Sequence, residues 1–485
     1  MSDITSIEEI KHKTITGFFW QLAQKFSTQG VSFIISIVLA RLLMPEDFGL
    51  IAMTTIFLRI AGIFVESGLG TSLVQSKSVD ERDYNTVFWA SLCLSLILYL
   101  LVFTTAPLIA QLYHNDLIAS IIRVLGLNIL FSAFSTVQNA SVMRVFDYKK
   151  FFYVSLIGTF ATGATGLMMA YSGKGVWALV GSNLIGSLTQ VLAMNRIVKW
   201  WPKFQFSLQR LKKLYGYGVN LMFAELLGTF FNELRGFLIG LKYRPSDLAF
   251  YNRGDALPQV FSNNISGTLN GVLFPAMSRV QDDKMQVKAA LRRSIMTSSF
   301  FIIPVMFLMS AMADKAIIVL YGEKWAMAIP FMQVISFKYC FNLLGGANTQ
   351  AIKAIGRSDV TLKLEFIKKP LFLIMLMITM QISPLAICIG NTIYDFVGAS
   401  INAYPNKRFL NYSYIEQLKD IAPQVLISLI TGIVVFALGF LAINIYITLF
   451  LQIVTGVLCY WGLARSIKLE SYRYILATIK EFRGK

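Results

Sequence analysis

Long apolar runs separated by short polar loops make up most of the chain. Each run is about 20 residues or longer, which is the length that an α-helix needs to cross the apolar core of a bilayer. The pattern therefore predicts an all-α integral membrane protein. Fourteen membrane-spanning helices are expected, at residues 15–41, 48–75, 84–109, 117–140, 151–171, 175–197, 215–241, 254–277, 294–313, 325–347, 360–381, 384–404, 421–441 and 443–465.

Two polar hairpins with the same pattern lie between these runs. The first contains Pro45 and Asp47, and the second contains Pro245 and Asp247, an offset of 200 positions (245 − 45 and 247 − 47). Proline cannot continue a helix through the turn, and Gly49 is expected to relieve the backbone where the next helix starts. The repeat predicts two pseudo-symmetric halves around a central cavity, a common plan in transporters.

The repeat also predicts how the chain divides. Residues 1–200 form an N-lobe of helices one to six, and residues 201–214 form a cytoplasmic inter-lobe loop. Residues 215–410 form a C-lobe of helices seven to twelve, and residues 411–485 hold the last two helices and a cytoplasmic tail. Basic and aromatic residues mix from position 196 to 213, so this connection is expected to be either an amphipathic segment on the inner leaflet or an ordinary positively charged loop.

Composition agrees with a membrane protein. Hydrophobic residues make up 55% of the chain and charged residues only 14%, against about 25% charge in a soluble domain. The net charge of +18 is spread over short loops rather than gathered on one domain, which argues against binding of nucleic acid. The four cysteines lie inside apolar runs and the two histidines have no metal-site spacing, so neither a disulfide nor a metal site is expected.

The charges in the loops predict an orientation. If the N-terminus is cytoplasmic, the expected inside loops carry most of the basic residues, whereas the outside loops around His114, Gly173 and Ser383 carry almost none. This positive-inside bias predicts a multi-pass protein with both termini in the cytoplasm. The first inside loop, residues 77–83, is slightly acidic and is an exception.

Ionisable and amide residues at membrane depth are the candidate functional residues, because each buried charge costs about 2.5–3.5 kcal/mol on insertion scales. Gln21, Lys25 and Gln29 recur every four residues in the first run and form one polar stripe. Arg59 and Glu66 are seven residues apart, about two helical turns, so they share a face and are alternatively a structural ion pair. Under the 200-residue offset, Lys25 aligns with a second charge, Glu225.

The first hairpin resembles the polysaccharide-exporter flippases, the Wzx-type branch of the multidrug/oligosaccharidyl-lipid/polysaccharide superfamily. The resemblance is carried by Trp20, by the string Leu39-Ala40-Arg41-Leu42-Leu43 leading to Pro45 and Phe48-Gly49, and by Gly68-Leu69. It implies two six-helix lobes around a central cavity in the bacterial inner membrane. It also implies movement of undecaprenyl-diphosphate-linked oligosaccharide from the cytoplasmic to the periplasmic leaflet by alternating access, for surface polysaccharide biosynthesis.

Depth and periodicity suggest roles for individual residues in that task, in which no residue is catalytic. Four cations are candidates to bind the diphosphate: Lys25, Arg59, Arg235 and Lys338. Five polar residues are candidates to contact sugar: Gln21, Gln29, Asn139, Asn232 and Tyr251. Three acids are candidates to couple transport to H⁺ or Na⁺: Glu66, Glu225 and Asp395. No resident cofactor is expected. The expected partners are the lipid-linked oligosaccharide, membrane lipid and other polysaccharide-assembly proteins, and the chain is expected to be a monomer.

Other functions make different demands on the sequence. A drug/cation antiporter of the same superfamily favours an acidic cavity, whereas the charges here are mixed and include Lys25 and Arg59. A peptidoglycan-precursor flippase is a second rival, against which the first-hairpin string argues. A membrane glycosyltransferase or polymerase needs a large outer loop with paired acids, and no predicted outside loop is longer than about fifteen residues. A purely structural scaffold does not need charges at mid-membrane depth.

Overall fold

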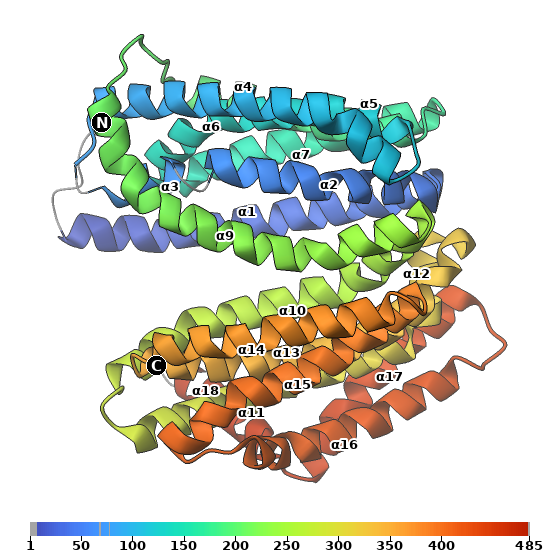
Figure 1. The fold of residues 1–485 in the computed structure, drawn as a ribbon. Coiled ribbons are helices and arrows are strands. Elements are labelled where there is room, and N and C mark those ends of the chain that lie inside the picture. Colours follow the sequence, from blue (N-terminus) through green and yellow to red (C-terminus); the bar gives the residue numbers. More distant parts are fainter. Residues whose placement is uncertain (1–6, 67–68, 77, 484–485) are drawn as a thin grey trace. The chain divides into compact units, whose positions relative to one another are not determined.

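The computed structural model describes residues 7–66, 69–76 and 78–483, which form helices and no strand (Figure 1). Gly68, one of the residues that carry the family resemblance, lies outside the described residues. The predicted all-α class is confirmed. The elements are α1 (Ile7–Leu42), α2 (Pro45–Glu66), α3 (Leu69–Gln75), α4 (Glu81–Leu112), α5 (Leu117–Leu125), α6 (Leu127–Arg144), α7 (Tyr148–Tyr171), α8 (Val176–Val198), α9 (Leu208–Lys242), α10 (Pro245–Arg279), α11 (Lys284–Ala311), α12 (Ala313–Tyr321), η1 (Glu323–Ala328), α13 (Ile329–Ala354), α14 (Ser358–Thr379), α15 (Pro384–Leu410), α16 (Tyr414–Leu438), α17 (Ile445–Ser466) and α18 (Glu470–Arg483).

Eleven helical segments of the described chain are long and apolar enough to cross a membrane. Each coincides with one of the predicted spans, and α2–α3, α5–α6 and η1–α13 each make up one segment. The other three predicted spans correspond to α9, α10 and α14, which are 35, 35 and 22 residues long. These three helices carry more polar and charged residues, such as Glu365 and Lys368 of α14. The chain is thus a multi-pass membrane protein, and the count of fourteen spans stays a prediction.

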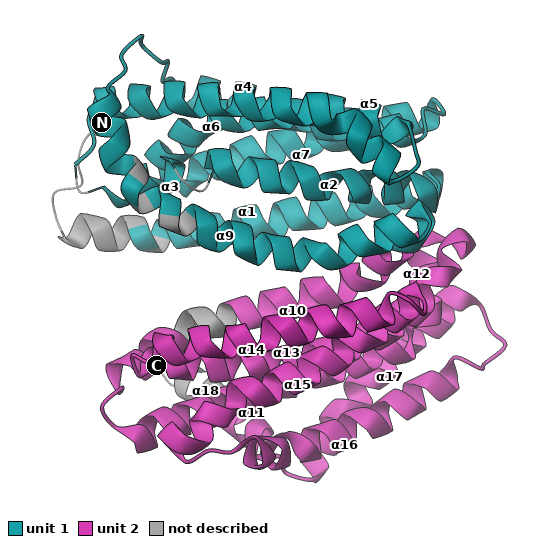
Figure 2. Cartoon of the chain, in the orientation of Figure 1, with its two compact units in different colours: residues 1–249 teal, residues 250–485 magenta. Residues whose placement is uncertain are grey.

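The contacts divide the chain into two compact units, Met1–Ala249 and Phe250–Lys485 (Figure 2). In the first unit α1 packs on α7, α7 on α8, and α9 against α2. In the second unit α13 packs on α15, and α11 on both α13 and α16. The sequence repeat assigned the seventh helix, α9, to the second lobe, whereas its contacts place it with the helices before it. The four-part division expected from the repeat remains a prediction.

The two predicted hairpins have the same local geometry. The Asp47 carboxylate accepts a 3.0 Å hydrogen bond from the Met44 N–H, and the Asp247 carboxylate accepts one of 3.1 Å from the Arg244 N–H. Each aspartate thereby satisfies a backbone donor at the start of its helix, α2 or α10. Pro45 and Pro245 occupy the first helical position, where the missing N–H costs nothing. The two hairpins therefore share the same capping hydrogen bond as well as the same sequence pattern.

Gly49 has a different role from the one expected. It lies inside α2 and does not have a positive φ angle, so it does not relieve the backbone. A Cβ atom at this position would lie 1.8 Å from the carbonyl oxygen of Pro245. Glycine is required because the first hairpin packs directly against the second, backbone to backbone.

The connection from α8 to α9 is a non-helical loop attached to α4. Trp200 packs in a buried cluster with Tyr84 and Phe88 of α4, and the exposed Phe204 ring stacks on Trp89 at 4.5 Å. The described residues 199–207 form no helix, and whether this segment lies on the inner leaflet stays a prediction.

An ion pair closes the same connection where α9 begins. Arg210 forms ion pairs with Asp80 and with Asp83, the latter at 3.0 Å. The hydrogen bond from the Arg210 guanidinium lowers the pKa of Asp80 to about 2. The start of α9 is therefore fixed to the start of α4 at neutral pH.

Candidate functional site: a polar cavity in the N-terminal unit

A cavity of about 400 Å³ lies beside the middle of α2. Its charged lining residues come from two helices, Arg59 and Glu66 from α2 and Glu225 from α9. Asn128 and Asn183 add amide groups from α6 and α8. The spacing of seven residues places Arg59 and Glu66 on one face of α2, as the sequence predicted.

The two charged residues of α2 that line the cavity have separate partners. Arg59 donates a 3.0 Å hydrogen bond to the carboxylate of Glu233 on α9, and its side chain remains 64% exposed. Glu66 accepts a 2.6 Å hydrogen bond from the Ser132 hydroxyl of α6. The alternative of a structural pair between Arg59 and Glu66 is therefore not what the structure shows.

A second cavity of about 540 Å³ continues from the first along α3 and α6. Both are lined by Glu66, Asn128 and Ser132, so they form one polar depression, termed here the N-unit cavity. Its lining includes residues of α2 and α3, from Ile51 to Val74, together with residues of α6, α8 and α9.

Two helices present matching polar stripes to the N-unit cavity. On α6 the stripe consists of Asn128, Ser132, Ser135 and Asn139. On α8 it consists of Asn183, Ser187 and Gln190. The intervals of three and four residues keep each stripe on one helical face. Hydroxyl and amide groups in such stripes can donate to and accept from sugar hydroxyls.

One amide oxygen in the cavity wall, that of Asn128, has no hydrogen-bond partner among the described residues. The Oδ1 atom of Asn128 is buried and accepts no hydrogen bond from the described residues. Because leaving a buried acceptor unpaired costs about 1–3 kcal/mol, such an atom favours a bound donor.

The structure brings four of the predicted site residues to the N-unit cavity: Arg59, Glu66, Glu225 and Asn139. Five others in this unit do not line it in the described chain: Gln21, Lys25, Gln29, Asn232 and Arg235. The polar stripe of α1 is exposed, because α1 turns a neighbouring face to α7, where the Gln24 amide donates to the Ser155 hydroxyl at 3.0 Å. The functional roles of all nine remain predictions.

Three predicted site residues belong to the second unit. Lys338 lies 4.0 Å from the carboxylate of Asp255, which also accepts a 2.7 Å hydrogen bond from the Tyr339 hydroxyl. Tyr251 is buried with its ring against Phe331. The remaining acid, at position 395, is half-buried on α15. The roles assigned to these three also remain predictions.

Sequence reasoning missed the neutral half of the cavity wall, notably Asn128, Asn183 and Gln190. The signal was available, because amides at membrane depth recur on α6 and α8 with helical spacing. A search weighted toward charges overlooks them, although an amide in an apolar run also needs a polar environment.

The fold is that of a known class of membrane transporters. A solved structure of the lipid II flippase MurJ in an inward closed conformation matches 95% of this chain and 100% of its own, with a TM-score of 0.75 and 14% sequence identity. An inward-facing multidrug resistance MATE family transporter of the MOP superfamily matches 79% of this chain and 94% of its own, with a TM-score of 0.64 and 14% identity.

The sequence identifies the family of the chain. Residues 38–330 match the model of the family described as polysaccharide biosynthesis protein, and the chain belongs to this family. The resemblance inferred from the first hairpin is confirmed. The succinoglycan biosynthesis transport protein ExoT of Rhizobium meliloti is 25% identical over 67% of this chain and 66% of its own length. The lipopolysaccharide biosynthesis protein WzxC of Escherichia coli is 21% identical over 89% and 88%.

Proposed function

We propose that this protein is a flippase that moves a lipid-linked oligosaccharide across the membrane for surface polysaccharide biosynthesis. The observation that carries the proposal is the N-unit cavity, in which exposed charges of both signs stand beside rows of amides and hydroxyls. Membership of the polysaccharide biosynthesis family and the names of ExoT and WzxC support it. Catalytic chemistry is not part of the proposal, so the protein acts as a transporter rather than an enzyme.

The proposed cargo is an undecaprenyl-diphosphate-linked repeat unit. The sugars bind the stripes of α6 and α8, whose amides and hydroxyls can donate to and accept from sugar hydroxyls. The diphosphate needs a fixed cation in a low-dielectric region, and Arg59 is the cation that lines the cavity. The polyprenyl tail stays in the bilayer, where its burial requires no protein site.

Glu66 and Glu225 are proposed to couple transport to an ion. Both line the same cavity as Arg59, and protonation or Na⁺ binding at a carboxylate changes the net charge that faces the diphosphate. Cargo and ion would then compete or cooperate through one electrostatic field. The proposed orientation has both termini in the cytoplasm of a bacterial inner membrane, as the basic loops indicate.

The drug/cation antiporter is the second candidate, because a MATE transporter shares the fold. Two acids of the cavity, Glu66 and Glu225, would suit a cationic drug, whereas the positive charge of Arg59, which is paired with Glu233, disfavours one. The presence of Arg59 among these acids is what favours an amphipathic anionic cargo over a cationic drug.

The experiment is lipid analysis of cells that lack this protein. Diphosphate-linked repeat units are expected to accumulate and to be confined to the cytoplasmic leaflet, as judged by their inaccessibility to an impermeant glycosidase added to spheroplasts. A plasmid copy of the chain should reverse the accumulation. Normal levels of the carrier, together with raised sensitivity to cationic drugs, would instead support the antiporter.

A further inference from the structure

The second unit contains another cavity, and none of the residues that line it has a role in the function proposed above. Its volume is about 460 Å³, and it lies between the beginning of α11 and the C-terminal helix α18. Three guanidinium groups line it, those of Arg292, Arg293 and Arg473, against the one carboxylate of Glu470. Hydroxyl groups of Thr297 and Ser471 complete the polar wall.

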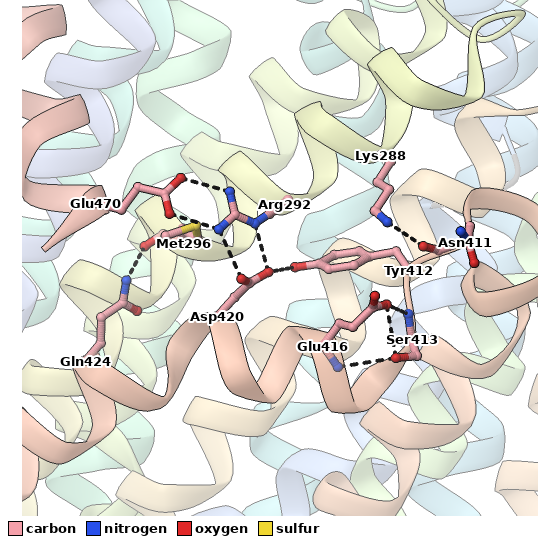
Figure 3. A network of polar contacts seen from close by, with 10 residues as sticks. All are labelled: Lys288, Arg292, Met296, Asn411, Tyr412, Ser413, Glu416, Asp420, Gln424 and Glu470. Carbon is pink, nitrogen blue, oxygen red and sulfur yellow. Dashed lines mark hydrogen bonds and ion pairs between the residues drawn. The ribbon is translucent and has the colours of Figure 1, made fainter.

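The helix that closes this cavity is firmly attached to the unit (Figure 3). Glu470 accepts two hydrogen bonds from Arg292 of α11, at 2.8 and 2.9 Å. The buried Ser471 hydroxyl, which Figure 3 does not draw, accepts one of 3.0 Å from Gln424 of α16. The Tyr472 ring packs at right angles to Trp461 of α17. The α18 wall of the cavity is therefore held in place by contacts with α11, α16 and α17.

The three arginines differ in how their charge is balanced. Arg292 is neutralised twice, by Glu470 and by Asp420, whose carboxylate oxygens accept from it at 3.0 and 3.1 Å (Figure 3). Arg293 lies over the Tyr474 ring at 4.7 Å. Among the residues whose side chains are described, no carboxylate pairs with Arg293 or with Arg473. Two positive charges of this cavity thus remain available to an anion.

Chemistry and position together identify the anion. Forked guanidinium donors with neighbouring hydroxyls match the oxygens of a phosphate. Arg293 directly precedes the predicted ninth span, 294–313, and the α18 tail is predicted to be cytoplasmic. The cavity accordingly lies at the depth of the inner-leaflet headgroups, where basic pockets between helices bind anionic lipid. We propose that it binds the phosphate of an anionic phospholipid, with Arg293 and Arg473 as its main ligands.

The test uses the full-length protein purified in detergent micelles that contain phosphatidylglycerol or zwitterionic phosphatidylcholine, with retained lipid counted by native mass spectrometry. The wild-type protein should retain phosphatidylglycerol in preference to phosphatidylcholine. Exchange of both free arginines, Arg293→Gln with Arg473→Gln, should lower that preference by about tenfold or more, since each removes charge-assisted hydrogen bonds. The variant Lys407→Gln with Arg408→Gln removes the same charge from exposed residues at the end of α15 and should keep the preference.

Three outcomes would overturn the proposal. The first is equal retention of both lipids by the wild-type protein, and the second is an equal loss of preference in the two double variants, which would indicate nonspecific attraction to surface charge. The third is displacement of the lipid by millimolar inorganic phosphate, which would assign the cavity to a free phosphate instead. Equal unfolding temperatures of all variants without added lipid show that the fold is unchanged.

Discussion

Arg59 and Glu233 face each other across α2 and α9, yet their contact does little for stability. An exposed ion pair contributes about 0–1 kcal/mol, and the Arg59 side chain is 64% exposed. Placing an arginine at membrane depth costs about 2.5–3.5 kcal/mol on insertion scales. The pair alone does not offset that cost, which favours a functional reason for the arginine, namely an anionic cargo.

Exchanging the charges of Arg59 and Glu233 distinguishes two roles of Arg59, which are to form an ion pair with Glu233 and to bind an anionic cargo. The single variant Arg59→Gln should abolish polysaccharide export while the protein remains at its normal level in the membrane. The exchange Arg59→Glu with Glu233→Arg restores an ion pair but moves the cation to α9, so export should stay lost. Export is measured as surface polysaccharide, and protein by immunoblot. Restored export in the exchange variant would show that only the ion pair matters.

At the scale of elements, hairpin geometry is what the sequence predicts best. The capping aspartates Asp47 and Asp247 and the two prolines follow from local chemistry, so their hydrogen bonds could be anticipated. The packing of one hairpin on the other depends on residues about 200 positions apart, so it cannot be predicted from the patterns of neighbouring residues. For this reason the glycine at position 49 was expected to relieve the turn, whereas the structure assigns it to packing.

The close approach of the hairpins leads to a stability prediction. Gly49→Ala places a methyl group against the Pro245 carbonyl, and overpacking of this kind costs about 1–3 kcal/mol. The unfolding temperature in detergent should fall. Gly30→Ala in α1 is the matched control, because its Cβ meets nothing within 4 Å and alanine is the better helix former. An unchanged unfolding temperature for Gly49→Ala would contradict the packing.

The attachment of α18 has a predicted pH dependence. The hydrogen bonds from Arg292 hold the pKa of Glu470 below its ordinary value of 4.5. The stabilisation is therefore complete above about pH 4.5 and is lost as the pH falls through the lower pKa of the folded state. Near neutral pH, Glu470→Gln should increase proteolysis of the chain after α17, whereas the wild-type tail should become equally sensitive only in acid. Equal protection of both proteins at pH 7 would refute this account.

At the scale of the whole molecule, composition and apolar periodicity predicted the class and the positions of the long helices. Of the candidate site, the charges Arg59, Glu66 and Glu225 were found because charge at membrane depth is conspicuous. The sequence gives the same reason to place Gln21 and Lys25 in the site. In the structure, however, they are exposed on α1 and line neither part of the N-unit cavity. Periodicity identifies a helical face but not the neighbour it meets, and that depends on tertiary packing.

The central claim is that this chain itself moves lipid-linked oligosaccharide between leaflets. The direct test reconstitutes the purified protein in liposomes with undecaprenyl-diphosphate-linked oligosaccharide and follows the fraction of sugar cleaved by an impermeant glycosidase. With the protein present, cleavage should proceed beyond the outer leaflet toward completion. Arg59→Gln and the double variant Asn128→Leu with Asn183→Leu should slow it, whereas Thr104→Leu on the exposed face of α4 should not. Cleavage that stops at the outer-leaflet fraction in wild-type liposomes would contradict the account.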